Sequence, residues 1–182
     1  MVKRKDDGYW ISHTEPIAAH HEDVFASITT PAGLTRWFPL AAEVDLREGG
    51  LIKLGWNEEF TRTTSVAILD YGAGGTIVWD WFASHQDFHA PLYWTVEPVL
   101  ATDPATDPAA NPAANPDADP ANPASNPANL EGTIVHLEQG PFQADHESLI
   151  AMAEEAQFWA WHLCNLRSVL EASHDMRQHR PL

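Results

Sequence analysis

The chain has 182 residues, 44% of them hydrophobic, and its 10 Lys and Arg against 26 Asp and Glu give a formal net charge of -16. A chain of this length suits one domain with a real hydrophobic core. Because so negative a surface repels phosphate backbones and anionic lipid, we expect neither nucleic acid nor a membrane as a partner.

The single cysteine, Cys164, cannot form a disulfide within the chain and suits a reducing compartment. The basic N-terminal segment passes directly into Asp6 and Asp7 without an apolar stretch, and no segment approaches the ~20 apolar residues that span a bilayer. We therefore expect a cytoplasmic protein in which Cys164 is a structural helix residue rather than a nucleophile.

The N-terminal part of the chain predicts one strand followed by two short helices. Residues 9–17 (YWISHTEPI) favour an edge strand that ends at Pro16. Residues 20–28 (HHEDVFASI) predict a helix whose buried side carries Val24, Phe25 and Ile28. A second helix is expected directly afterwards, because Thr30 can cap it and Pro31 suits its first turn.

Alternating apolar and polar residues then predict a six-strand antiparallel meander at 42–50, 51–56, 63–71, 76–82, 92–97 and 133–138. One face of this sheet is aromatic and aliphatic and the other is charged, so an amphipathic element must cover the first face. The side chains expected on the apolar face are Val44, Leu46, Ile52, Leu54, Trp56, Trp79, Trp81, Leu92, Trp94, Val96, Val135 and Leu137.

Residues 101–129 are unlike the rest, because Asp-Pro or Asn-Pro recurs at 103, 107, 111, 115 and 119 and again at 122 and 126. Proline blocks helix and sheet hydrogen bonds, and the tract has no large apolar side chain to bury, so we expect disorder with transient turns. Sequence typical of strands flanks both ends. This favours an insertion in a hairpin turn within a single domain at 1–182 over a linker between two domains.

Two acidic groups could suggest metal sites, and we favour neither. Calcium binding in the tract would use Asp103, Asp107, Asp117 and Asp119, but the alternating ligands and turn glycine of a calcium loop are missing. His20 and His21 precede Glu22 and Asp23, but adjacent side chains on a helix diverge, which favours solvated capping. We expect no metal and no cofactor.

Residues 145–173 contain no Gly or Pro and predict a long helix. At 100° per residue, one apolar arc of roughly 140° forms, and we expect it to cover the sheet and complete an α+β fold. The arc contains Met152, Phe158, Trp159, His162, Leu163, Leu166, Val169 and Leu170.

His162 lies inside this arc, with Glu155 and then Ser148 along the same line. Such a polar row must find partners in the interior or face a cavity that holds water or ligand. Two interpretations stay open. In the first, His162 is a core histidine bonded to a neighbour or to water, and Glu155 lies near a frayed helix start. In the second, both residues are polar contacts of a largely apolar pocket.

The segments VFASITTPAGLTRWFP, REGG, IVWDW, GTIVHLEQG and WHLCNLRSVLE together resemble the chaperone-ATPase-activator-homologue (AHSA) branch of the START-like, or SRPBCC, superfamily. The resemblance covers Tyr9 to Arg177 except for the 101–129 tract. It implies the helix-grip fold, in which a curved antiparallel sheet wraps a long C-terminal helix and encloses an apolar cavity. Many relatives carry a histidine shortly before the glycine that ends the last strand, whereas Gln139 precedes Gly140 here. The family offers no universal catalytic motif, so we assign no catalytic residue.

We expect binding of a small apolar or aromatic molecule between the helix and the sheet. One alternative is a co-chaperone or stress-related protein-binding module, which the resemblance suggests although the acidic surface offers no basic docking patch. Another is a cyclase- or dehydratase-like enzyme using His162 and Glu155, which lie about 10 Å apart along the helix axis. The sequence leaves the oligomeric state open. The expected ligand contacts are Trp56, Trp79, Trp81, Trp94, Glu155, Phe158, Trp159, His162 and Leu166.

Overall fold

The computed structural model describes residues 1–57, 59–72, 74–82, 89–99 and 132–179. Within these ranges the elements in chain order are β1 (Val2–Lys5), β2 (Gly8–Ile17), α1 (His21–Thr29), α2 (Pro31–Thr35), β3 (Ala41–Val44), β4 (Leu51–Gly55), β5 (Thr63–Gly72), β6 (Thr76–Asp80), β7 (Leu92–Pro98), β8 (Thr133–Phe142), α3 (His146–Ala172) and the 3-10 helix η4 (Met176–His179). Of the helices in these ranges, none combines the length and apolar character that crossing a bilayer requires.

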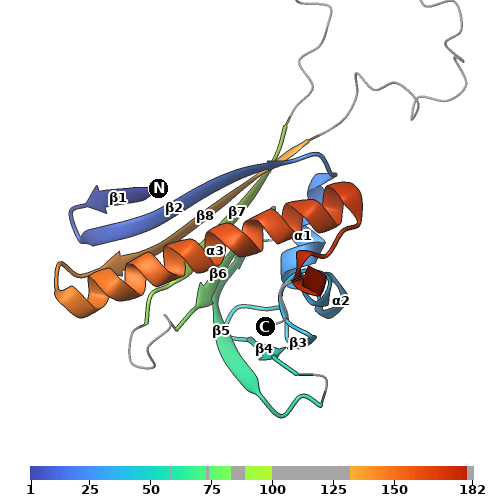
Figure 1. Cartoon of the computed structure of the whole chain (residues 1–182), viewed down its shortest axis with the longest axis horizontal. Helices are drawn as coiled ribbons and strands as arrows, with labels where there is room; N and C mark the ends of the chain where they lie inside the picture. Colours follow the sequence, from blue (N-terminus) through green and yellow to red (C-terminus); the bar gives the residue numbers. More distant parts are fainter. Residues whose placement is uncertain (58, 73, 83–88, 100–131, 180–182) are drawn as a thin grey trace, which may run out of the picture.

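The strands form one antiparallel sheet in the order β1-β2-β8-β7-β6-β5-β4-β3. Figure 1 shows α3 lying across one face of the curved sheet, with α1 and α2 beside its C-terminal half. The predicted α+β helix-grip architecture is confirmed.

The N-terminal hairpin differs from the prediction, because β2 is not an edge strand. β1 pairs with β2 from Val2↔Ile11 to Lys5↔Gly8, and β8 pairs with the other side of β2. Pro16 is tolerated inside β2 because it lies beyond the residues that pair with β1, where the strand has one neighbour only. The two short helices therefore follow the second strand, not the first.

Local sequence explains the two short helices as predicted. The Thr30 hydroxyl accepts a hydrogen bond from the Gly33 amide at 3.0 Å and caps α2, whose first residue is Pro31. Val24 and Ile28 of α1 are fully buried against the sheet, and Phe25 is half-buried.

The long helix α3 begins and ends with recognisable caps. Asp145 accepts hydrogen bonds from the amide and the hydroxyl of Ser148 at 2.9 and 2.7 Å. Ser173 ends the helix in a left-handed conformation with φ 52°. The predicted arc faces the sheet, and its buried members are Met152, Trp159, His162, Leu163, Leu166 and Val169.

The apolar face of the sheet is the other half of the core. Its predicted residues from β4 and β6–β8 are buried, namely Ile52, Leu54, Trp79, Trp81, Leu92, Trp94, Val96, Val135 and Leu137. Val44, Leu46 and Trp56 are half-buried and pack against them. β8 continues to Phe142, beyond the predicted end at 138, because Gln139 and Phe142 turn inward as well.

β7 and β8 pair directly up to Pro98↔Thr133, so the strands on either side of the 101–129 tract are antiparallel neighbours. The tract itself, with the four aspartates considered for calcium, lies outside the described residues. Among the residues that are described, no group of His, Cys, Asp and Glu is arranged to hold a metal ion. His21 instead contacts the Val96 carbonyl at 3.0 Å.

The contact between α1 and α2 gives the first prediction. A Cβ added to Gly33 would meet the Ala26 carbonyl oxygen and would lie 2.6 Å from the Ser27 Cα, both of them backbone atoms. We expect Gly33→Ala to lower the free energy of unfolding by ~2 kcal/mol or more through overpacking. Gly74→Ala is the matched control, because no atom lies within 4 Å of that position. Equal urea midpoints for the two variants would contradict the prediction.

Candidate functional site

Aromatic rings fill the space between α3 and the sheet. Trp79 of β6, Trp94 of β7 and Trp159 of α3 are each no more than 1% exposed. The Trp159 ring centroid lies 6.5 Å from Trp79, 5.6 Å from Trp94 and 5.1 Å from Trp81, which follows β6. The interior in which the sequence analysis expected a ligand is therefore walled by indoles.

Two further rings enter this interior from the segment that follows α2. The Phe38 centroid lies 4.9 Å from the His162 ring and 5.4 Å from the rings of Trp159 and Trp56. Trp37 is also fully buried, and its indole donates to the Ser27 carbonyl at 2.8 Å. Neither was among the predicted contacts. Their signal in the sequence was an apolar pair directly after a short helix, which indicates burial but not the place.

Residues 35–39, which carry these two rings, are fixed by the C-terminal part of the chain. The Asn165 amide donates to the Trp37 carbonyl at 2.7 Å. The Arg177 guanidinium donates to the carbonyls of Pro39 and Thr35 at 2.7 and 2.9 Å. It also forms an ion pair with Asp175 at 2.7 Å. Because these acceptors are backbone atoms, the sequence carried no sign of the arrangement.

Glu155 is buried, with 2% exposure, and accepts hydrogen bonds from its own helix α3, from β8 and from the residue that follows β6. Its Oε2 atom accepts from the indole of Trp81 at 2.9 Å, the indole of Trp159 at 3.2 Å and the amide of Gln139 at 3.3 Å. A buried carboxylate needs such donors to offset its lost hydration. Glu155 therefore does not lie at a frayed helix start.

Sequence reasoning missed Gln139 as a partner of this carboxylate. The period of two that placed Val135 and Leu137 on the inner face also places Gln139 there, and that signal was available. Gln139 supplies an N–H group to Glu155 from the inner face of β8.

His162 is the second polar group of the interior. Its Nδ1 atom lies 2.9 Å from the Phe158 carbonyl, which can only accept, so Nδ1 carries the hydrogen. Burial lowers the pKa of His162 to about 4, an effect that the bond to Phe158 partly opposes and the charge of Arg177 reinforces. At neutral pH the ring is therefore neutral, and its Nε2 atom is an acceptor.

Several buried polar atoms of this region have no partner among the residues that the structure describes. They are the indole N–H groups of Trp79 and Trp94, the Nε2 atom of His162 and the Oε1 atom of Gln139. The interior thus offers both donors and acceptors within aromatic walls.

The remaining predicted contacts divide between interior and margin. Leu166 is fully buried beside the rings. Trp56 and Phe158 are half-buried at the edge of the cluster, where the Trp56 indole donates to Thr64 at 2.8 Å. The structure thus brings the predicted residues together around Trp159, with Trp56 and Phe158 on the more accessible side.

A comparison with protein families gives a match over part of the chain. Residues 18–105 match the family model described as "Activator of Hsp90 ATPase homolog 1-like protein" (AHSA1). The predicted resemblance to the AHSA branch of the START-like superfamily is confirmed. A comparison with curated proteins gives no match.

Several solved structures share this fold at low sequence identity. Protein SSP2350 from Staphylococcus saprophyticus is 16% identical with a TM-score of 0.63, covering 92% of this chain and 96% of its own. The Aha1 dimer from Colwellia psychrerythraea is 17% identical with a TM-score of 0.60, covering 90% of this chain and 96% of its own. CalU16 from Micromonospora echinospora is 17% identical with a TM-score of 0.58, covering 98% of this chain and 86% of its own. At these identities the likeness establishes the fold alone.

The lowered pKa of His162 gives the second prediction. The unfolded chain, in which the pKa returns to 6.5, binds the proton first as the pH falls. The stability gained from a neutral His162 is therefore complete above about pH 6.5 and is lost as the pH falls towards about 4. Between about pH 7 and about pH 5, we expect the wild type to lose ~2 kcal/mol more unfolding free energy than His162→Asn. Identical losses in urea titrations would show that His162 is not buried in the neutral form.

The carboxylate gives the third prediction. Glu155→Leu leaves the N–H groups of Trp81, Trp159 and Gln139 without this acceptor, at about 1–3 kcal/mol for each unpaired group. We expect a loss of at least ~3 kcal/mol of unfolding free energy, and a smaller loss for Glu155→Gln, which keeps one acceptor oxygen. Denaturant unfolding of both variants measures the difference. A leucine variant as stable as the glutamine variant would contradict it.

Proposed function

We propose that the protein binds a small, neutral aromatic molecule carrying a hydroxyl group in the interior between α3 and the sheet. The observation that supports this proposal is the set of buried polar atoms without partners around Trp159, above all the indole N–H groups of Trp79 and Trp94 and the Nε2 atom of His162. Each unpaired buried group costs about 1–3 kcal/mol, and folded proteins keep few of them.

A hydroxyl group matches these atoms because it both donates and accepts. Its hydrogen can be donated to His162 Nε2, and its oxygen can accept from an indole N–H. The rings of Trp79, Trp94 and His162 border the same Trp159 ring, with centroids at 6.5, 5.6 and 6.2 Å. One small molecule can therefore reach more than one of them.

The walls of the site favour an aromatic ligand, and the charge of the site favours a neutral one. Indole and phenyl rings favour an aromatic partner, by stacking or edge-to-face contact. An anionic ligand is disfavoured because the Glu155 carboxylate lies in the same interior. A neutral molecule avoids this repulsion.

Entry of the ligand requires the Phe38 ring to move. That ring lies among His162, Trp159 and Trp56, where the ligand ring would lie. The more accessible rings of Trp56 and Phe158 border it, at 5.4 and 6.0 Å between centroids, and mark the side of entry. Truncation of Phe38 should therefore open the site without removing its polar groups.

The alternatives from the sequence are less well supported. For an enzyme that uses the His162 and Glu155 pair, Glu155 would have to accept or deliver a proton while its Oε2 atom is held by three N–H groups. The co-chaperone alternative, which the AHSA1 description suggests, stays a prediction with no particular contact in its favour.

The fourth prediction compares naphthol with naphthalene, which differ by one hydroxyl group. We expect both to bind Phe38→Ala saturably, with naphthol ~10-fold tighter because of the added hydrogen bond. The wild type should show the same preference with weaker binding, since Phe38 must first be displaced. Isothermal titration calorimetry gives both dissociation constants.

His162→Phe removes the Nε2 acceptor and should abolish the preference for naphthol. In the wild type, naphthol should shift the indole N–H resonances of Trp79 and Trp94 in ¹H–¹⁵N spectra, and not that of Trp10 on the opposite face of the sheet. Lack of saturable binding to both the wild type and Phe38→Ala would disprove the proposal, as would an unchanged preference in a folded His162→Phe variant.

A further inference from the structure

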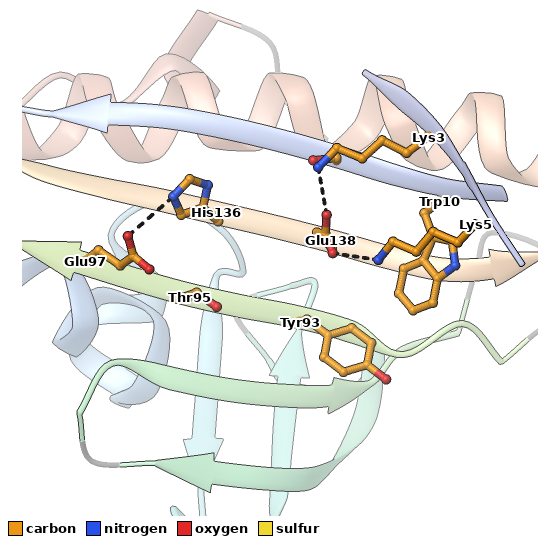
Figure 2. Close-up of a pocket in the computed structure, with 9 residues that line it drawn as sticks. Lys3, Lys5, Trp10, Tyr93, Thr95, Glu97, His136 and Glu138 are labelled. Atoms are coloured by element: carbon orange, nitrogen blue, oxygen red, sulfur yellow. Dashed lines mark hydrogen bonds and ion pairs between the residues drawn. The ribbon is translucent and has the colours of Figure 1, made fainter. Parts of the chain in front are cut away.

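A separate pocket lies on the face of the sheet that points away from α3. Its volume is about 530 Å³, and strands β1, β2, β7 and β8 contribute its lining. Tyr93 and Glu138 belong to this outer face, because they pair across β7 and β8 while their neighbours Trp94 and Leu137 are buried on the inner face. Figure 2 shows the side chains of Lys3 and Lys5 extending from β1 towards Glu138.

The aromatic wall of this pocket lies beside a β-bulge in β8. Between the pairs Tyr9↔Phe142 and Ile11↔Gln139, β8 has one residue more than β2, so Gly140 and Pro141 lie opposite Trp10. Gly140 makes room for the indole, since a Cβ there would lie 2.7 Å from Trp10 Cδ2. The Trp10 indole donates to Asp7 at 2.9 Å, and its ring lies 5.7 Å from Tyr93.

The cationic wall is unusual in so acidic a chain. Lysine occurs only at positions 3, 5 and 53, and two of these lysines line this pocket. Lys3 and Lys5 both form ion pairs with Glu138, at 3.0 and 2.9 Å, so the three groups together carry one net positive charge. Hydrogen bonds from Lys5 and then Lys3 hold the pKa of Glu138 below its usual range, which keeps the carboxylate ionised at neutral pH.

Protection of an edge strand does not account for this arrangement. Lysines on an edge strand discourage pairing with another sheet when their charges lie along the open edge. Here both ammonium groups turn over the face of the sheet to reach β8, and Lys5 Nζ lies 3.8 Å from the Trp10 ring centroid. The pocket thus combines two converging cations with an exposed aromatic side chain, Tyr93, which is 39% exposed.

We infer that this outer pocket binds a small aromatic carboxylate. The carboxylate lies between the Nζ atoms of Lys3 and Lys5, where one positive charge is uncompensated by Glu138. The ring lies against Tyr93 and the edge of Trp10. An aromatic cation is disfavoured because the two lysines would repel it. Glu97 could attract a cation, but it lies at the far end of the pocket, 3.8 Å from His136 and away from the Tyr93 and Trp10 rings.

The test compares naphthoate with naphthamide, its neutral analogue of nearly the same shape, and with naphthylmethylammonium as the cation. We expect naphthoate to bind the full-length protein at one site, ~10-fold or more tightly than naphthamide, as measured by calorimetry at fixed salt concentration. In ¹H–¹⁵N spectra the Trp10 indole N–H resonance should shift on titration, while those of Trp79 and Trp94 stay in place. This readout separates the outer pocket from the interior site of the proposed function.

Lys5→Met and Lys53→Met remove the same charge from different places and form a matched pair. Lys53 pairs with Glu43 at 3.9 Å, between β4 and β3, at the other end of the sheet order. We expect Lys5→Met to weaken naphthoate binding ~10-fold without affecting naphthamide binding. Lys53→Met should leave the binding of both compounds unchanged, and Lys5→Arg should retain most of the affinity for naphthoate. Equal weakening by the two methionine variants would overturn the inference. Tighter binding of the neutral or cationic compound, or shifts confined to the interior indoles, would overturn it as well.

Discussion

A buried carboxylate has to be surrounded by hydrogen-bond donors, and at Glu155 two of those donors come from the sheet side and one from its own helix. The Trp81 indole follows β6, the Gln139 amide belongs to β8, and the Trp159 indole lies one helical turn away on α3. Apolar contact between a helix and a sheet is non-directional and tolerates sliding, whereas these bonds require one register. These bonds fix the position of α3 along the sheet, and with it the place of Trp159 against Trp79 and Trp94.

The second constraint comes from the other end of α3. Asn165 and Arg177 bind the carbonyls of residues 35–39, the segment that carries Trp37 and Phe38 into the interior. Because these bonds hold the segment's backbone, the Phe38 side chain can move while its main chain stays in place. In the proposed function, a fixed backbone would thus be combined with one ring, Phe38, whose displacement would admit the ligand.

Periodicity explains how much of this could be predicted from the sequence. The period of two in the strands and the 3.6-residue period of residues 145–173 correctly placed the inner face of the sheet and the buried arc of α3. They could not find β1, whose side chains are all exposed and therefore carry no alternating pattern. They placed Trp81, Gln139 and Trp159 on the interior side, but they could not show that Trp81 and Gln139 bind Glu155, or that Arg177 binds carbonyls, because these contacts join residues that lie apart in the chain.

β8 connects the two faces of the sheet, and so the two sites. Three consecutive residues serve different surroundings: Glu138 points outward to the lysines, Gln139 points inward to Glu155, and Gly140 makes room for Trp10. Since successive side chains of a strand lie on opposite faces, a slip of one residue would bury Glu138 and expose Gln139. β8 keeps its alternation up to Gly140, and the extra residue opposite Trp10 shifts it before Phe142, which is buried. One strand thus contributes to the aromatic interior and to the cationic outer pocket, whose proposed ligands would share no contact.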